Sequence, residues 1–512
     1  MSQPNTALPN LENAAAAAQA LAEGKPALVW RKVVADSDTP VGAARRLIEP
    51  GRGDFLLESV EGGEVRGRYS LLGLDPDLVF RASEGVGEVN RDWKTDREAF
   101  EPCERDALTE LRALADSCRI DMPPEAENPL PPALACLVGY FGYETIGLVE
   151  TLPRAPASEL ALPDMLFVRP TVILVFDGLT DELFCIAPIW SATDPVRAIE
   201  AADDRIDETL RSLAQRQSEE SRSADVPVPE LTPIMDGEDY KTLVARAKDY
   251  ILAGDIFQVV LAQRFTCPFE LPPLELYRAL RRVNPSPFLY FLDLPGFAIV
   301  GSSPEILVRV RDGEVTIRPI AGTRPRGKTR AEDDANEVSL LADPKELAEH
   351  LMLLDLGRND VGRVAAQGSV EVTDSFTIER YSHVMHIVSN VIGQLAPDKQ
   401  ALDALFAGFP AGTVSGAPKI RACEIIAELE PETRGAYAGG VGYFAPDGSV
   451  DSCIVLRTAV VKDGVMNVQA GAGIVADSDP DYELAECRAK AGALIAAAKE
   501  AVRVASEPGF GQ

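Results

Sequence analysis

The sequence predicts an α+β fold built on antiparallel β-sheets. Runs rich in β-branched residues surround an Asp-Gly pair within 170–188, and further runs are joined at Asp447-Gly448 and Asp463-Gly464. An Asp-Gly pair is typical of a tight hairpin turn, and strands joined by short turns pair as antiparallel neighbours. Stretches with a helical spacing of apolar residues lie between or beside these runs. We therefore expect antiparallel sheets with helices packed against them.

The expected elements follow in order along the chain. Residues 11–23 are rich in alanine and should form a helix, and residues 27–187 mostly have the pattern of strands. Residues 194–216 carry isoleucine and leucine at helical spacing. Residues 239–255 predict a further helix, which ends at a glycine.

A polar, proline-bearing stretch at 217–233 is the best linker candidate in the chain. We therefore expect an N-terminal domain over 1–225 and a second domain over 226–512. No internal repeat of solenoid type is visible.

Composition and charge exclude several classes of protein. The 512 residues carry a net charge of −30, which repels phosphate backbones and anionic membranes. No apolar run approaches the roughly 18 residues of a membrane span, and the N-terminus lacks the pattern of a signal peptide. The eight cysteines are scattered and form no Cys-x-x-Cys pair, as expected in a reducing cytoplasm. We expect neither nucleic acid nor a membrane as a partner.

Two stretches repeat the tetrad Glu-Leu-Ala-Glu after an Asp-Pro pair. The glutamates are Glu346 and Glu349 in the first stretch, and Glu483 and Glu486 in the second. Positions i and i+3 of a helix share a face, so each tetrad directs two carboxylates the same way. One interpretation is a solvated acidic face. The other is a pair of facing helices whose carboxylates hold a cation, for which all-oxygen ligands favour Mg²⁺, Mn²⁺ or Ca²⁺ over zinc.

Other candidate residues are histidines, glycine-rich stretches and one arginine. His350, His383 and His386 are the only histidines in the chain, and each could transfer protons near neutral pH or simply pack. The stretches 318–327, 409–419 and 469–480 could bind an anion through backbone N–H groups, or could be ordinary turns. Arg457 lies in an apolar strand, so its partner is either a structural aspartate or a carboxylate of the substrate.

Together these segments resemble one family, the component I subunits of anthranilate synthase among the chorismate-using enzymes. The resemblance covers about 26–185 and 238–498, and it implies the fold of those enzymes, a β-sandwich core flanked by helices. It also assigns tryptophan-feedback inhibition to the N-terminal domain and chorismate binding to the second domain. The stretches that carry it include "FLLES", "GDIFQVVLAQRF", "NPSPF", "GSSPE", "PIAGTRPRG", "ELAEHLMLLDLGRND", "YSHVMHIVS", "FPAGTVSGAPK", "DSCIVLRTA" and "GAGIVADSDPDYELAE".

The resemblance implies a division of labour among the candidate residues. Glu349 and Glu486 would bind Mg²⁺ directly, with Glu346 and Glu483 beside it, and the metal would hold the ring carboxylate of chorismate. Three residues would be catalytic: the general acid Glu305, the histidine His386, and Thr413. The implied substrate-binding residues are Gly322, Thr323, Tyr443, Arg457, Gly471, Ala472, Gly473 and Lys490.

Two positions separate this chain from relatives with other products. Gln258 stands where isochorismate-forming and salicylate-forming relatives have a lysine that activates water. Ala321 stands where aminodeoxychorismate synthases typically have a nucleophilic lysine. The remaining activity is the addition of ammonia to chorismate followed by loss of pyruvate, which yields anthranilate.

The resemblance also implies a partner and an inhibitor. The chain has no glutaminase segment with a nucleophilic cysteine, so a separate glutamine amidotransferase subunit, component II, is expected to supply ammonia. Stretches 56–59 and 284–287 match the family's site for L-tryptophan. The implied inhibitor-binding residues are Glu58, Ser59, Pro287, Phe288 and Leu289.

Overall fold

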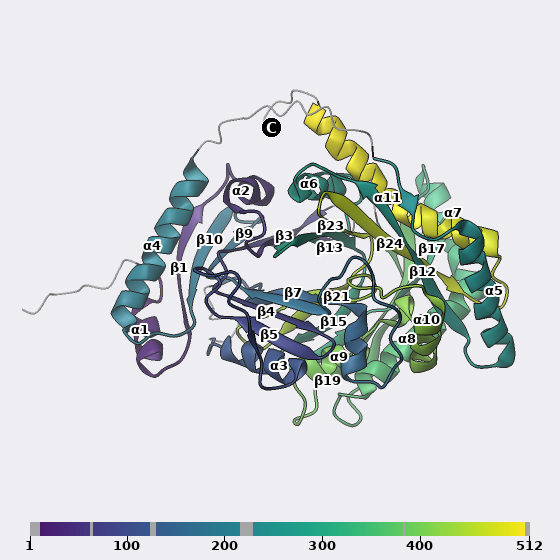
Figure 1. Ribbon diagram of the computed structural model, residues 1–512, viewed down its shortest axis with the longest axis horizontal. Helices are drawn as coiled ribbons and strands as arrows, with labels where there is room; N and C mark the ends of the chain where they lie inside the picture. The colour runs from purple at the N-terminus through teal and green to yellow at the C-terminus, as the bar shows by residue number, and fades with distance from the viewer. Residues whose placement is uncertain (1–10, 62–64, 123–129, 216–228, 382–383, 507–512) are drawn as a thin grey trace, which may run out of the picture.

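The computed structural model describes residues 11–61, 65–122, 130–215, 229–381 and 384–506. Within these ranges two twelve-stranded sheets, A and B, lie face to face, and all their strand pairs are antiparallel (Figure 1). Apolar side chains of both sheets, such as Ile299 of A and Tyr140 of B, form the core between them. The expected α+β fold with an antiparallel sandwich core is confirmed.

Sheet A lies above sheet B in Figure 1. In spatial order it contains β1 (Ala27–Val34), β10 (Glu182–Ile189), β9 (Val172–Asp177), β3 (Val65–Leu74), β2 (Asp54–Glu61), β13 (Phe288–Leu294), β14 (Phe297–Ser303), β23 (Thr458–Lys462), β24 (Val465–Ile474), β12 (Gln258–Pro268) and β11 (Thr232–Pro233), with β20 (Gly416–Ala417) also paired to β12.

Sheet B follows the same principle with a different set of strands. In spatial order it contains β17 (Ile320–Pro325), β19 (Val384–Gln394), β16 (Glu314–Ile317), β15 (Ile306–Arg311), β22 (Val450–Ile454), β21 (Gly440–Phe444), β7 (Leu137–Phe141), β8 (Met165–Arg169), β4 (Leu78–Ser83), β5 (Val86–Asn90) and β6 (Glu101–Pro102), with β18 (Glu371–Arg380) also paired to β19.

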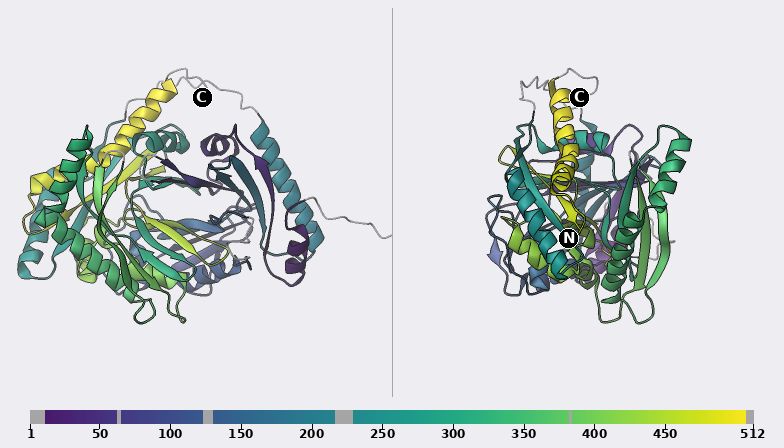
Figure 2. Two further views of the ribbon diagram at one scale, coloured as in Figure 1. Left: turned by 180° about the vertical axis from the view of Figure 1, so that it is seen from behind. Right: turned by 90° about the vertical axis from the view of Figure 1, so that its right-hand side faces the viewer.

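Helices cover the outer faces of the two sheets, as Figures 1 and 2 show. Sheet A is covered by α1 (Ala14–Ala22), α2 (Pro40–Leu47), α4 (Pro195–Ala214), α6 (Pro273–Val283) and α11 (Pro480–Ser506). The other helices are α3 (Ala107–Ser117), α5 (Gly237–Ala253), α7 (Arg330–Leu341), α8 (Pro344–Gly362), α9 (Ala401–Gly408) and α10 (Lys419–Leu429), with 3₁₀ turns η2 (Tyr143–Leu148) and η3 (Gly412–Val414).

The helices confirm the main local expectations. The predicted helices at 11–23, 194–216 and 239–255 are α1, α4 and α5. Gly254 ends α5 with φ 86°, a left-handed conformation that glycine adopts without steric cost. The hairpin expected at 170–188 is formed by β9 and β10.

Strands from both sides of residue 225 take part in each sheet. In sheet A the two groups meet where β2 pairs with β13, and in sheet B where β7 pairs with β21. The division into domains at 1–225 and 226–512 stays a prediction, and part of the expected linker, 216–228, lies outside the described residues.

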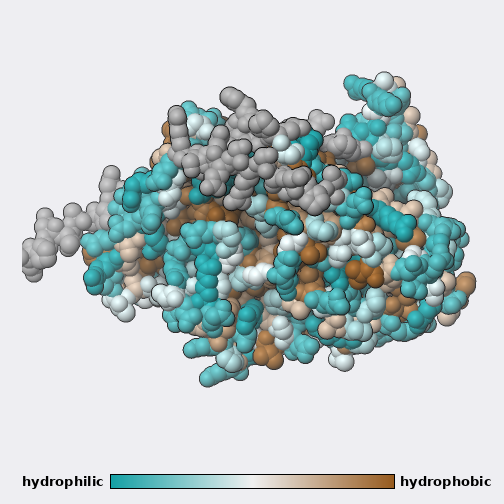
Figure 3. Space-filling view, turned by 45° about the horizontal axis from the view of Figure 1, so that its top comes forward, coloured by the Kyte–Doolittle hydropathy of each residue, from teal (hydrophilic) through white to brown (hydrophobic). Residues whose placement is uncertain are grey.

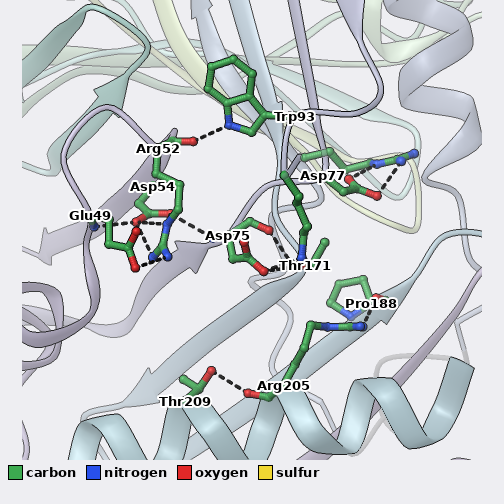
Figure 4. Close-up of polar contacts among 12 residues, drawn as sticks. Glu49, Arg52, Asp54, Asp75, Asp77, Trp93, Thr171, Pro188, Arg205 and Thr209 are labelled. Atoms are coloured by element: carbon green, nitrogen blue, oxygen red, sulfur yellow. Dashed lines mark hydrogen bonds and ion pairs between the residues drawn. The ribbon is translucent and has the colours of Figure 1, made fainter. Parts of the chain in front are cut away.

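The seam between β2 and β13 ends in a buried polar cluster (Figure 4). Asp54 is fully buried, and its carboxylate accepts hydrogen bonds from the Arg52 side chain and from the backbone N–H groups of Glu49 and Asp75. Trp93 donates its indole N–H to the Arg52 carbonyl at 2.7 Å. Because buried charges need partners, these contacts allow the charged start of β2 to lie inside the protein.

The surface agrees with the acidic composition. The face in Figure 3 is mostly hydrophilic, with apolar residues in small scattered groups. No helix within the described ranges is long and apolar enough to cross a membrane.

Candidate functional site

The repeated Asp-Pro pairs begin the two helices that carry the acidic tetrads. Asp343 accepts a hydrogen bond from the Lys345 backbone N–H at 3.0 Å, and Asp479 accepts one from the Tyr482 N–H at 3.0 Å. An aspartate before a helix satisfies a free N–H group, and proline fits the first turn. The repeat is therefore a helix start that places a pair of glutamates within the first two turns of α8 and of α11.

The four glutamates, Glu346, Glu349, Glu483 and Glu486, lie in one neighbourhood, which we call the acidic site. Burial raises the pKa of both Glu349 and Glu483. The positive charges of Lys345 and Lys490 oppose this shift at both carboxyl groups without cancelling it. Two lysines can act on carboxylates from both helices only if the helices lie close together.

Each of three carboxylates in the acidic site has a protein partner. Glu346 pairs with Arg324 at 3.0 Å, and Glu486 pairs with Lys490 at 2.7 Å. Gln258 Nε2 donates to Glu349 Oε1 at 3.3 Å. No set of three or more His, Cys, Asp or Glu side chains is arranged to ligate a metal within the described ranges.

The predicted glycine cradle lies on β24 beside this site. Gly471 to Gly473 pair with β12, and the carbonyl of Gly471 accepts a hydrogen bond from Lys490 Nζ at 2.9 Å. A Cβ at Gly473 would lie 2.4 Å from Gln258 Nε2, and one at Gly471 would lie 2.8 Å from the Tyr437 hydroxyl oxygen. At Gly471 a Cβ would also lie 2.9 Å from the Leu261 backbone oxygen, which cannot move aside, whereas at Gly473 the end of the Gln258 side chain would have to shift.

His386 is held against β17 by its Nδ1 atom. Nδ1 lies 3.0 Å from the Gly322 carbonyl oxygen and 3.0 Å from Thr323 Oγ1. A carbonyl can only accept, so the neutral ring carries its proton on Nδ1 and leaves the Nε2 lone pair free. Burial lowers the pKa of His386 to about 4. The ring is therefore neutral at pH 7 and can accept a proton.

Glu305 lies between β14 and β15 with its carboxyl group buried. Burial raises its pKa to about 8, although the Thr413 side chain and the Ile320 backbone oppose the shift. The Thr413 hydroxyl is itself buried and has no hydrogen bond of good geometry among the described residues. A carboxyl group with this pKa is protonated at pH 7 and can donate a proton.

Arg457 precedes β23 with φ 47°. Burial of Arg457 lowers the pKa of the guanidinium, an effect that Tyr381 partly offsets, and no carboxylate of the described residues acts on it. Its positive charge also lowers the pKa of His386. A half-buried cation beside His386, with no carboxylate partner among the described residues, is suited to bind the carboxylate of a ligand.

A cavity, which we call the seam cavity, lies where β2 pairs with β13. It has a volume of about 880 Å³ and is lined by all five predicted inhibitor residues. The register pairs Glu58 with Leu289 and Ser59 with Phe288, which explains why stretches so distant in sequence meet here. The Glu58 carboxylate also accepts hydrogen bonds from Tyr277 and Arg281 of α6.

Tyr443 does not join the other predicted substrate-binding residues. It lines the seam cavity, together with Ser59 and Phe288. The tyrosine that faces the glycine cradle is Tyr437, six residues earlier, which sequence reasoning missed. The close approach of its phenol to Gly471 is the structural signal that identifies it.

The remaining histidines lie apart from this arrangement. His350 is fully buried, its Nε2 lies 2.6 Å from Ser389 Oγ, and its ring packs edge-on against Phe376, so it serves packing. His383 lies outside the described residues.

The family model described as chorismate binding enzyme matches residues 56–496. The chain belongs to this family of chorismate-binding enzymes.

Named relatives place this chorismate-binding enzyme more narrowly. It is 52% identical over 491 residues to "Anthranilate synthase component 1" of Cereibacter sphaeroides, covering 95% of this chain and 97% of the relative. The crystal structure of anthranilate synthase component I from Streptococcus pneumoniae is 35% identical, covers 90% of this chain and 99% of that one, and superposes with a TM-score of 0.74. The chain thus belongs with the anthranilate synthase component I proteins.

The fold itself is shared more widely. The menaquinone-specific isochorismate synthase of Escherichia coli is 18% identical, covers 95% of this chain and all of that one, and superposes with a TM-score of 0.66. At this identity the likeness shows the fold alone.

Proposed function

We propose that this enzyme is the chorismate-aminating subunit of an anthranilate synthase, which converts chorismate and ammonia into anthranilate and pyruvate at the start of tryptophan biosynthesis. The observation that carries the proposal is the grouping of a protonated acid, Glu305, a neutral base, His386, and a cation, Arg457, around Tyr381: the His386 ring packs on it, and Glu305 and Arg457 interact electrostatically with it. The group lies next to the acidic site, because Gly322 binds His386 through its carbonyl and a Cβ on it would lie 3.1 Å from Glu346 Oε2. The high identity to anthranilate synthase component 1 supports the same activity.

The substrate is a dicarboxylate, and the site offers different partners for its two carboxylates. Arg457, Lys490 and the backbone at Gly471 to Gly473 would bind the enolpyruvyl carboxylate. Thr323 and Gly322 would lie along the ring, and the acidic site would receive the ring carboxylate together with a cation, because carboxylates alone repel it.

The residues of the acidic site fit Mg²⁺. Their donors are all carboxylate oxygens, and Mg²⁺ binds through one or two protein carboxylates together with water and substrate oxygens, so a larger protein ligand set is not required. Glu349 and Glu486 would hold the ion, with Glu346 and Glu483 beside it. When bound, the ion would neutralise charge between the substrate and these glutamates.

The reaction needs one acid and one base. Glu305 donates a proton to the C4 hydroxyl, which leaves as water while ammonia forms the new bond at C2. The added ammonia loses a proton to solvent. His386 then takes the C2 proton at Nε2, the C3–O bond breaks, and the ring becomes aromatic. The enolate of pyruvate that leaves takes a proton at its methylene carbon, so His386 returns to its neutral form and pyruvate is released. General acid–base steps of this kind contribute about 10²–10⁴-fold each.

Two side chains support this product over its alternatives. Gln258 is buried, and a glutamine amide cannot act as the base that water would need. Ala321 is buried on β17 and carries no group that could form a covalent intermediate. Aminated product should therefore form without a covalent adduct and proceed to anthranilate.

The test is an assay of the purified chain with chorismate, Mg²⁺ and an excess of ammonium at neutral pH, where Glu305 keeps its proton. We expect fluorescent anthranilate of the correct mass, equimolar pyruvate, and loss of activity when EDTA removes the metal. Isochorismate or aminodeoxychorismate as the main product would refute the proposal.

The source of ammonia is a further part of the proposal. The amine would come from a glutamine amidotransferase subunit, component II. The purified chain alone should use ammonium and not glutamine. Formation of anthranilate from glutamine without a partner would contradict this part.

We also propose that the seam cavity binds L-tryptophan and that binding inhibits the enzyme. Its volume of about 880 Å³ suits a ligand of this size, and the chain matches the family's inhibitor site at Glu58, Ser59 and Pro287 to Leu289. We expect inhibition by L-tryptophan that is relieved in Ser59→Leu. A parent enzyme that millimolar-scale tryptophan does not inhibit would refute this part.

A further inference from the structure

One tyrosine belongs both to the seam cavity and to the surroundings of His386. Tyr381 follows β18, is 9% exposed, and lines the cavity that also contains Ser59 and Phe288. Its ring packs edge-on against the His386 ring, with centroids 5.5 Å apart and an angle of 63° between the planes. A single side chain therefore lies between the cavity and the proposed base.

The polar wall of the cavity holds Tyr381 in place. Its hydroxyl donates to Glu379 Oε2 at 2.8 Å, and Glu379 pairs with Arg318. The Tyr381 carbonyl accepts a hydrogen bond from Arg326 Nη1 at 2.6 Å. Glu379 and Arg318 line the same cavity, so a ligand bound there would contact the ion pair that accepts the hydrogen bond of the Tyr381 hydroxyl.

The other groups around His386 extend this connection. The charges of Arg457 and Glu379 both act on the pKa of the imidazole, and Glu305 acts on the pKa of the Tyr381 phenol. Edge-to-face aromatic pairs have a preferred geometry, so a rotation of one ring changes the environment of the other. His386 keeps its Nδ1 contacts to Gly322 and Thr323 only in its present orientation.

We infer that Tyr381 is a positioning residue for His386, and that an occupant of the seam cavity changes the state of His386 through the Tyr381 ring and its bond to Glu379. The inference rests on the proposed function in one respect, that L-tryptophan is the occupant.

The experiment follows the histidine rings by NMR in the full chain. With three histidines in the chain, ¹³C-histidine labelling gives few ring signals, and the signal that disappears in His386→Ala assigns His386. The variants are Tyr381→Leu, which removes the ring, and Tyr381→Phe, which keeps the ring and removes the bond to Glu379. Tyr250→Phe is the matched control, because its phenol also donates to a carboxylate, that of Glu428, on the surface.

We expect L-tryptophan to shift the His386 signal in the parent and in Tyr250→Phe. In Tyr381→Leu this shift should disappear even when the cavity is saturated with L-tryptophan, whose Kd for the variant is measured separately because Tyr381 lines the cavity. Tyr381→Phe should reduce the shift by about half. The pKa of His386 should rise by about one unit or more in Tyr381→Leu, because water reaches the ring.

The outcomes test three claims separately: the positioning of His386 by Tyr381, its coupling to the seam cavity, and the binding of L-tryptophan. A Tyr381→Leu variant with the pKa of His386 and the tryptophan-induced shift of the parent would overturn the inference. If Tyr381→Leu does not fold, an unchanged shift in Tyr381→Phe would overturn the coupling. If the parent does not bind L-tryptophan, the feedback part of the proposed function fails, and the pKa of His386 alone decides the positioning role of Tyr381.

Discussion

Two arginines close to the proposed substrate site are held in opposite ways. Arg434 is 3% exposed, pairs with Glu430 at 2.5 Å, and donates to the carbonyl oxygens of Val260 and Val414 at 2.7 and 2.8 Å. Arg457 has no carboxylate partner among the described residues, and burial lowers its pKa. A buried charge with all its partners in the protein belongs to the fold, whereas one without them is prepared for a ligand.

Two glutamates, Glu430 beside Arg434 and Glu305 in the proposed substrate site, differ in the same way. Glu430 accepts hydrogen bonds from Arg434 and from the Ala262 N–H. Glu305 has no cation partner in the part of the chain that the structure describes, and burial raises its pKa to about 8. The regions are adjacent, because Arg434 binds the carbonyl of Val414, the residue after Thr413. The ion pair of Arg434 and Glu430 therefore holds the backbone next to Thr413, close to the groups that have no partner.

The largest expected effect is on activity, in Glu305→Gln. The amide cannot donate the acid's proton, so kcat should fall by about 10²–10⁴-fold. In the parent, kcat should decline as pH rises through about 8, and this alkaline limb should be absent in the variant. A pH–rate profile of ammonia-dependent anthranilate formation measures both.

Glu305 should also affect stability in a defined direction. Its folded pKa of about 8 lies above the ordinary value of 4.5, so the folded state binds the extra proton between these values. Its contribution is present below pH 4.5 and is lost as pH rises through about 8. Urea unfolding of parent and Glu305→Gln across this range checks the sign, and a parent stabilised through Glu305 at rising pH would contradict it.

Arg434→Met should give the next largest effect, on stability. It leaves Glu430 buried without its cation, which costs about 3–5 kcal/mol of unfolding free energy. Arg358→Met is the control, because Arg358 pairs with Asp355 on the surface and should cost less than about 1 kcal/mol. Equal urea midpoints for the two variants would remove the distinction between the regions.

Arg457→Met should affect substrate binding and not folding. Loss of a hydrogen-bonded charge costs about 1.5–3 kcal/mol, so the KM for chorismate should rise by roughly 10–150-fold, with the urea midpoint equal to or above that of the parent. Arg457→Lys keeps the charge without the planar fork and should be intermediate. If Arg457→Met lowers the unfolding free energy as much as we expect for Arg434→Met, then Arg457 stabilises the fold and is not reserved for the substrate.

Tyr437→Phe should give the smallest effect. It removes the hydroxyl that faces Gly471 and keeps the ring that lies over Arg434. We expect a loss of about 0.5–1.5 kcal/mol, seen as a rise in the KM for chorismate of roughly 2–12-fold. Tyr443→Phe is the matched control and should leave this KM unchanged, because Tyr443 lines the seam cavity.

Local sequence patterns predicted the starts and ends of helices and one tight hairpin. The Asp-Pro starts of α8 and α11, the end of α5 at Gly254 and the β9–β10 hairpin follow from capping and turn preferences, and they are found. The resemblance named residues on several segments, and the structure brings the four glutamates together and places all five predicted inhibitor residues around one cavity.

Long-range placement could not be predicted in the same way. Tyr437 and Tyr443 lie six residues apart in one glycine-rich stretch, and only the pairing of β21 with β22 and β7 determines which of them reaches which site. Likewise, the pattern of 27–187 does not reveal that its strands complete sheets begun by residues far beyond them.

The seam between β2 and β13 has a consequence for how the polypeptide can be divided. Expressed as separate halves, each piece would present unpaired β2, β13, β7 or β21 edges, which attract other chains and favour aggregation. Co-expressed halves could instead close both sheets by complementation, and the seam cavity would form only at their junction. Recovery of ligand binding would then report that two fragments had reassembled into one enzyme.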